Sequence, residues 1–159
     1  MNLFCVFKSK NPLDAEEIFE DTWLKFLDRI RQGKIPESVL SYLFAIARNL
    51  AIDRYRAEIS KKTITIEYRD YLNFEDDYSQ LSTENLVDAD ELKEVIMGVL
   101  SNMDDIYSEV FIMQWFGGLT QREISETLNI GLSAVKMRSH RAMKEVIKYV
   151  KPIYKNYDE

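Results

Sequence analysis

The amino-acid sequence predicts an all-α protein made of two small helical domains that are joined by a flexible acidic linker. The chain has 159 residues, 46% of them apolar, which is enough to form a core in one ordinary domain or two small ones. Only five glycines and three prolines occur, and runs of β-branched residues are scarce, so helix is favoured over sheet. Helical patterns flank a stretch without clear periodicity. We therefore place the domains at 1–60 and 83–159 and the linker at 61–82.

Two long helices are predicted in the first domain. Asp14 and Glu17 have the spacing of a capping box, so the first helix is expected to begin at Asp14. Gly33 and Pro36 end it, and a second helix is predicted from about Ser38 to Ser60. The apolar positions of the first helix are Ile18, Phe19, Trp23, Phe26, Leu27 and Ile30, and the buried stripe of the second is Val39, Leu43, Ile46, Ala47 and Leu50.

The second domain is predicted to begin with two helices. One covers about Thr83 to Leu100, where apolar residues recur at helical spacing. The next is capped by Asp104 or Asp105, and it ends at the Gly-Gly pair 117–118.

A helix-turn-helix is predicted over Leu119 to Val150. Thr120 and Glu123 form a capping box that opens its first helix. The turn lies at 129–131, with Gly131 supplying backbone freedom, and Ser133 is the expected N-cap of the second helix. The packed side of that second helix is Val135, Ser139, Ala142, Val146 and Val150.

Charge is distributed in blocks, although the net charge is -6. Residues 131–152 hold six Lys/Arg against one acid, and residues 44–62 hold five bases against two acids. Residues 63–95 hold ten acids and two bases. The basic second helix of the helix-turn-helix fits DNA, with its first turns on base edges and its later lysines on phosphates. A solvated amphipathic helix is the alternative, and the capping box, turn and core spacing together favour DNA.

Several classes of function are disfavoured by the composition. Cys5 is the single cysteine and His140 the single histidine, which excludes an internal disulfide or multi-cysteine cluster and weakens any histidine-based metal site or triad. No phosphate-binding G-x-x-x-x-G-K-[ST] loop occurs. No signal peptide and no apolar run of about 18 residues is present. We expect a cytoplasmic protein that is not an enzyme, with no catalytic residues, no metal, no cofactor and no membrane span.

Two motifs resemble bacterial RNA polymerase sigma factors of the extracytoplasmic-function (ECF) group in the sigma-70 family. The segment LTQREISETLNIGLSAVKMRSHRAMKEV, from Leu119, resembles the family's C-terminal helix-turn-helix. YLFAIARNLAIDRYR, from Tyr42 to Arg56, is similar to the family signature W-L-x-x-I-A-R-N-x-x-x-D-x-x-R, and DAEEIFEDTWLKF, from Asp14, resembles the segment before it. The motifs stand in family order, and the resemblance covers about Asn11 to Tyr149. It implies an N-terminal bundle of the sigma region 2 type and a C-terminal domain of the region 4 type.

The resemblance also implies the function of a sigma factor. Such a protein binds core RNA polymerase, through the β′ clamp helices and the β flap, and directs promoter recognition and opening. Domain 1–60 would contact the polymerase and the −10 element of promoter DNA, and domain 83–159 the −35 element. An anti-sigma factor is a further expected partner.

The family's functional residues carry over by resemblance to three groups. The −35 group lies in the helix-turn-helix and comprises Thr120, Ser133, Lys136, Met137, Arg138, His140, Arg141 and Lys144. The −10 group comprises Lys34, Arg48, Asn49, Arg54 and Arg56, with Tyr42, Phe44 and Tyr55 as stacking surfaces. The polymerase-docking group comprises Glu17, Glu20, Asp21 and Leu24. Alternatives stay open: the docking residues could form an ordinary solvated face, Tyr42 and Phe44 could belong to the core, and His140 could be buried.

The sequence also departs from the family pattern. Gln114 stands where an arginine often contacts DNA, and Glu20 stands where Gln is usual. The family usually begins with a further helix of about twenty residues before the segment that matches Leu3 to Lys10. Two alternatives stay open: the true start lies upstream, or the N-terminal domain is trimmed and its core is less complete. Two rival functions remain: a stand-alone helix-turn-helix regulator, and a sigma-like adaptor without promoter-opening activity. The Tyr42 to Arg56 motif argues against the first and the basic helix against the second.

Overall fold

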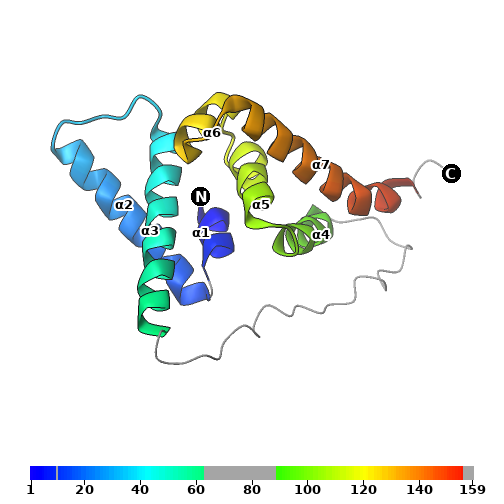
Figure 1. Cartoon of the computed structure of the whole chain (residues 1–159), viewed down its shortest axis with the longest axis horizontal. Helices are drawn as coiled ribbons and strands as arrows, with labels where there is room; N and C mark the ends of the chain where they lie inside the picture. The colour runs from blue at the N-terminus through cyan, green and yellow to red at the C-terminus, as the bar shows by residue number, and fades with distance from the viewer. Residues whose placement is uncertain (10, 63–88, 156–159) are drawn as a thin grey trace.

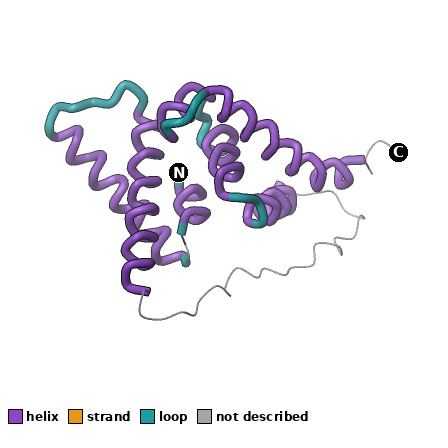
Figure 2. The backbone as a smooth tube through the Cα atoms, in the orientation of Figure 1, coloured by secondary structure: helices purple, strands orange, loops and turns teal. Residues whose placement is uncertain are grey.

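The computed structural model describes residues 1–9, 11–62 and 89–155, and these form helices joined by short loops, without a strand (Figure 2). The helices in chain order are α1 (Asn2–Lys8), α2 (Pro12–Arg31), α3 (Val39–Lys62), α4 (Ala89–Ser101), α5 (Asp105–Phe111), the π-helical turn η2 (Ile112–Phe116), α6 (Gln121–Leu128) and α7 (Leu132–Lys155). The predicted all-α class is confirmed. Most of the predicted linker and the start of the helix expected from Thr83 lie outside the described residues.

The described helices form two units, which we name the N-terminal unit (α1–α3) and the C-terminal unit (α4–α7). The short helix α1 lies between α3 and α5, and α6 lies beside the start of α3 (Figure 1). One cluster of buried apolar side chains runs through both units, from Phe4 and Phe44 to Met113 and Ile124. The two units therefore share a core, because burying these faces against each other removes apolar surface from water.

Asn11 and Pro12 set the start of α2, which differs from the prediction. The N-cap is Asn11, whose Oδ1 accepts a hydrogen bond from the backbone N–H of Asp14 at 2.9 Å, and Pro12 occupies the first turn. The predicted start at Asp14 was wrong because proline suits the first helical position, where its missing N–H costs nothing. The Asp14 carboxylate instead accepts from the Asn11 amide at 2.7 Å.

The inner face of α3 is made by Leu43, Phe44, Ala47 and Ala51, which are all buried. Phe44 is 1% exposed and meets Phe4 edge to face, with ring centroids 5.1 Å apart. Of the two roles left open for Phe44, a stacking surface for bases or a core residue, the structure therefore supports the core. Val39 was expected in the buried stripe but is exposed, since it lies at the first residue of the helix.

In the C-terminal unit, α5 continues into η2, and η2 ends at the glycine pair 117–118, as predicted. Asp104 is the N-cap residue of α5, although its side chain makes no capping hydrogen bond. Gly117 follows η2, and Gly118 adopts a positive φ of 71°, which only glycine accepts at low cost.

The helix-turn-helix is formed by α6 and α7, and its predicted capping box is present. Thr120 Oγ1 accepts from the backbone N–H of Glu123 at 3.2 Å, and Glu123 Oε2 accepts from the backbone N–H of Thr120 at 2.9 Å. The turn is made differently from the prediction. Asn129, not Gly131, takes the left-handed conformation, with φ 52°, which asparagine tolerates. Because α7 begins at Leu132, Gly131 and not Ser133 precedes its first residue, and the Gly131 carbonyl accepts from Ala134 and Val135.

Candidate nucleic-acid interface

The helix α7 presents one basic face to solvent. Its opposite side is packed through Val135, Ser139, Ala142 and Val146, as predicted. The exposed residues of its first half recur at intervals of three and four, which places them on one side of a helix. They are Ser133, Lys136, Met137, His140, Arg141 and Lys144, with Arg138 half-buried at the edge. A cationic helix face with its packed side anchored is suited to a groove of duplex DNA.

Two side chains of α7 form hydrogen bonds with residues of α5 and η2. Ser139 Oγ donates to Gln114 Oε1 at 2.8 Å, so Gln114 contacts α7 itself. Arg141 Nη1 donates to the Tyr107 hydroxyl at 2.8 Å, and its guanidinium lies 5.8 Å from the centroid of the Tyr107 ring. These contacts fix the rotation of α7 about its axis relative to α5. They also hold the Arg141 side chain at the edge of the exposed face.

Thr120 is exposed at the start of α6, and its hydroxyl lies 2.8 Å from Glu123 Oε2. Hydrogen bonds from the Thr120 backbone and from Ser38 hold the pKa of the Glu123 carboxyl below its usual range. Farther along α7, the hydrogen bond to Glu145 raises the pKa of Lys148. The ends of the helix-turn-helix are thus stabilised by local charge-assisted hydrogen bonds.

On the N-terminal unit, two groups of predicted site residues pair with each other. Arg54 Nη1 lies 2.7 Å from Glu17 Oε2 and 3.8 Å from Asp14 Oδ1, while its Nη2 lies 3.1 Å from Asp21 Oδ2. Arg54 was expected to contact DNA, and Glu17 and Asp21 to contact the polymerase. In this structure the three side chains form ion pairs that fasten α3 to α2, and their roles toward DNA and the polymerase stay predictions. Glu20 and Leu24 lie on α2 as exposed side chains, Leu24 with 64% of its surface open.

The remaining −10 residues lie on the loop after α2 and along α3. Lys34 is exposed on that loop, and Asn49, Tyr55 and Arg56 are exposed on α3. Tyr42 is half-buried, and the Arg29 guanidinium lies 4.8 Å from the centroid of its ring. These exposed side chains lie on one loop and one helix, whereas the face of the Tyr42 ring is covered by the Arg29 guanidinium.

Arg48 has a partner that the sequence did not reveal. Its Nε donates to Glu109 Oε1 at 3.0 Å, and Lys8 Nζ lies 3.5 Å from the same oxygen. Glu109 is only 5% exposed and stands between buried residues of α5. A lone acid within an apolar helical run was the available signal, since such a charge is rarely buried unpaired.

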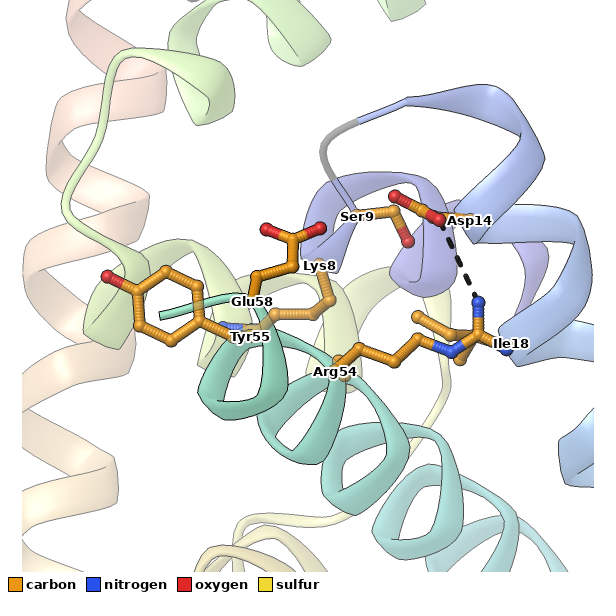
Figure 3. Close-up of a pocket in the computed structure, with 8 residues that line it drawn as sticks. Lys8, Ser9, Asp14, Ile18, Arg54, Tyr55 and Glu58 are labelled. Carbon is orange, nitrogen blue, oxygen red and sulfur yellow. Dashed lines mark ion pairs between the residues drawn. The ribbon is translucent and has the colours of Figure 1, made fainter. Parts of the chain in front are cut away.

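A small pocket lies beside this region, between the end of α1, the start of α2 and the last turns of α3 (Figure 3). Figure 3 shows Arg54 reaching across it toward Asp14, with Tyr55 and Glu58 on the opposite side. Four of its eight lining residues are charged, and the two cations among them, Lys8 and Arg54, are engaged in ion pairs. Among the described residues, no group of three or more His, Cys, Asp or Glu side chains could hold a metal ion. Among the same residues, no helix is both long and apolar enough to cross a membrane.

Comparisons with known proteins match both units to one family. Residues 4–59 match Sigma-70 region 2, and residues 93–146 match Sigma-70, region 4. The chain is 26% identical over 148 residues to the ECF RNA polymerase sigma factor SigW of Bacillus subtilis, covering 90% of this chain and 79% of that protein. It is 27% identical over 147 residues to the ECF RNA polymerase sigma factor SigM of the same organism, covering 90% and 83%.

A solved structure shares the fold. This is the sigma factor RpoE of Bartonella quintana, in a co-crystal structure with the anti-sigma factor NepR, with a TM-score of 0.66 and 16% identity. The match covers 94% of this chain and 89% of that one. Since region 2 and region 4 follow each other in order and ECF sigma factors match across most of the length, the chain belongs to the sigma-70 family, in its ECF group.

Proposed function

We propose that this chain binds core RNA polymerase, directs it to promoters that have separate −10 and −35 elements, and assists strand opening. Residues 83–159 read the −35 element through the exposed face of α7. Residues 1–60 contact the polymerase and the −10 strand. The chain works in the cytoplasm, through binding energy and without catalysis of its own.

The observation that carries this proposal is the basic face of α7 within a region 4 match. Its base-facing positions lie in the first turns of the helix, and Lys144 and Lys148 extend the cationic face toward phosphates. A region 2 match on the same chain supports a polymerase subunit over a stand-alone regulator, because a regulator needs only the helix-turn-helix.

Reconstitution with core polymerase tests the proposal. Run-off transcription from a library of upstream DNA regions is expected to start at a subset of promoters only when the chain is present. A chain that binds duplex DNA tightly alone, and never changes the start sites of the polymerase, would support the regulator instead.

A paired variant then tests the assignment of α7. Lys136→Ala with Arg141→Ala is expected to lower promoter binding by the holoenzyme by about tenfold or more, since each removes a phosphate or base contact. Binding to core polymerase should stay unchanged. Lys93→Ala, which removes an exposed lysine of α4, is the control. Equal losses for both proteins, or an equal loss of polymerase binding, would count against the assignment.

A further inference from the structure

Tyr107 of α5 stands beside Arg141, a cation of the basic face of α7. The Tyr107 hydroxyl accepts from Arg141 Nη1 at 2.8 Å, and the guanidinium lies 5.8 Å from the centroid of the Tyr107 ring. The ring is half-buried and packs against the core, whereas Arg141 is exposed. Because packing restricts the ring, its hydroxyl is a fixed acceptor for a long side chain that would otherwise sample many rotamers.

The acceptor that holds Arg141 is neutral. Arg54, by contrast, is held by three carboxylates of α2, and a phosphate would have to displace them. Glu145, one turn farther along α7 than Arg141, accepts from Lys148. The Tyr107 hydroxyl uses one of the five N–H donors of the guanidinium and adds no negative charge. Arg141 is therefore oriented by this contact without losing its attraction for an anion.

The place of Arg141 on α7 suits a phosphate better than a base edge. Arg141 follows Leu132, the first residue of the helix, by nine residues, which is about 13 Å along the axis. The residues of a helix-turn-helix that reach base edges lie at the start of its second helix. In addition, Tyr107 holds the guanidinium at the side of the exposed face where α5 packs along α7 (Figure 1). A helix that lies in a groove has the phosphate backbones beside its edges, so a cation placed there meets a phosphate.

We propose that Tyr107 is a positioning residue for promoter binding, which holds Arg141 ready for a backbone phosphate beside the −35 element. This rests on the function proposed above. Holding the guanidinium in place before binding reduces the side-chain entropy that promoter binding must remove. Because a phosphate contact carries no information about the bases, the pair adds affinity without changing the sequence that α7 prefers.

A double-mutant cycle in the full chain, bound to core polymerase, tests the pair. Tyr107→Phe keeps the ring and removes only the hydroxyl, and it is expected to lower the affinity of the holoenzyme for a promoter fragment about two- to tenfold, the cost of ordering one long side chain. Arg141→Ala is expected to lower the affinity further and to reduce the slope of log affinity against log salt concentration by about one. In the Arg141→Ala background, which is the control, Tyr107→Phe should change nothing, because the side chain that it positions is absent.

The free chain provides a second readout, which does not depend on the polymerase. NMR relaxation of the Arg141 Nε–H group is expected to show restricted motion in the native chain and faster, wider motion in Tyr107→Phe. Arg141→Lys is the second variant, and it replaces Tyr107→Phe if that protein melts below the assay temperature. It keeps the positive charge but lacks the planar guanidinium that the hydroxyl holds. Its affinity is expected to match that of Tyr107→Phe, with the native salt slope.

Four results would overturn the proposal. Equal losses from Tyr107→Phe in the native and Arg141→Ala backgrounds would show that the hydroxyl acts through the fold. A loss that differs among fragments with substituted −35 base pairs would place Arg141 on a base edge. Native or tighter promoter binding by Tyr107→Phe, or unchanged motion of Arg141 in that variant, would show that the hydroxyl does not prepare Arg141 for binding.

Failure of the proposed function looks different. If the native holoenzyme binds no promoter fragment, that function fails, and the role of Tyr107 fails with it. A native holoenzyme that binds promoters, while the cycle shows no coupling between Tyr107 and Arg141, leaves the function intact and removes only the role of Tyr107.

Discussion

At the scale of single residues, the same kind of side chain serves different purposes according to its neighbours. Lys136 and Lys144 are cations on an open helix face, while Arg54 is surrounded by three carboxylates of α2. In the sequence, Lys136, Lys144 and Arg54 are equivalent, since each is a basic residue in a segment predicted to bind DNA. Their surroundings now distinguish a cation available to a ligand from one that holds two helices together.

A prediction follows for the surface of α2. Glu20→Lys is expected to weaken association with core polymerase several-fold, because it reverses an exposed charge of the predicted docking group, outside the Arg54 cluster. Its melting temperature should stay near the native value. Co-purification with the polymerase and a thermal melt measure the two properties. Native polymerase binding by Glu20→Lys would remove this residue from the docking group.

Arg54→Gln should show the opposite pattern. It leaves Asp14, Glu17 and Asp21 to repel one another, and it is expected to lower the free energy of unfolding by about 1 kcal/mol, since these pairs are partly exposed. A large loss of promoter opening without any loss of stability would mean that Arg54 leaves the cluster to contact DNA.

At the scale of elements, local sequence described some helix starts correctly and missed others. The capping box of Thr120 and Glu123 is local, and it formed as expected. At α2 the competing signal was Asn11-Pro12, only two residues from the predicted start, and the preference of proline for the first helical turn decided the start. At the turn of the helix-turn-helix, Asn129 took the left-handed position, since asparagine tolerates it and stands directly after α6.

The capping box also predicts a pH dependence. The pKa of Glu123 is lowered by hydrogen bonds to its charged form, so its contribution to stability is present above its ordinary pKa of 4.5 and is lost as pH falls through the lowered value. Glu123→Gln should lower the free energy of unfolding at neutral pH and reduce its decline as the pH falls below the ordinary glutamate range. Urea unfolding measures both. The control is Glu126→Gln, an exposed residue of the same helix, and an identical acid slope in the two variants would contradict the prediction.

At the scale of the whole molecule, a single core joins two units that the sequence divided. Phe44 of α3 packs against Phe4 and lies beside Gly117, and the buried cluster continues into α5, α6 and α7. Such continuity predicts cooperative unfolding, because exposing the core of one unit also exposes that of the other.

The two tryptophans allow a direct test of this cooperativity. Trp23 lies in α2 and Trp115 in η2, so Trp23→Phe and Trp115→Phe each leave a fluorescent reporter in one unit. The two reporters are expected to show the same unfolding midpoint in urea. Adding Phe44→Ala, which removes a buried ring at a cost of about 3–5 kcal/mol, should lower both midpoints together. A shift confined to the Trp23 reporter would show that the units unfold independently.

Sequence alone determined the helices from α2 onward, the helix-turn-helix, the packed side of α7 and the likeness to the sigma-70 family, whereas α1 was not predicted. These depend on apolar spacing, capping and motifs, whose physical causes act within a few residues of one another. Only the tertiary structure decided which charges pair and which aromatic residues are buried. Arg48 and Glu109 are 61 residues apart in the chain, and Arg54 and Glu17 are 37 apart. No local pattern specifies such partners, because their distance is set by how whole helices pack.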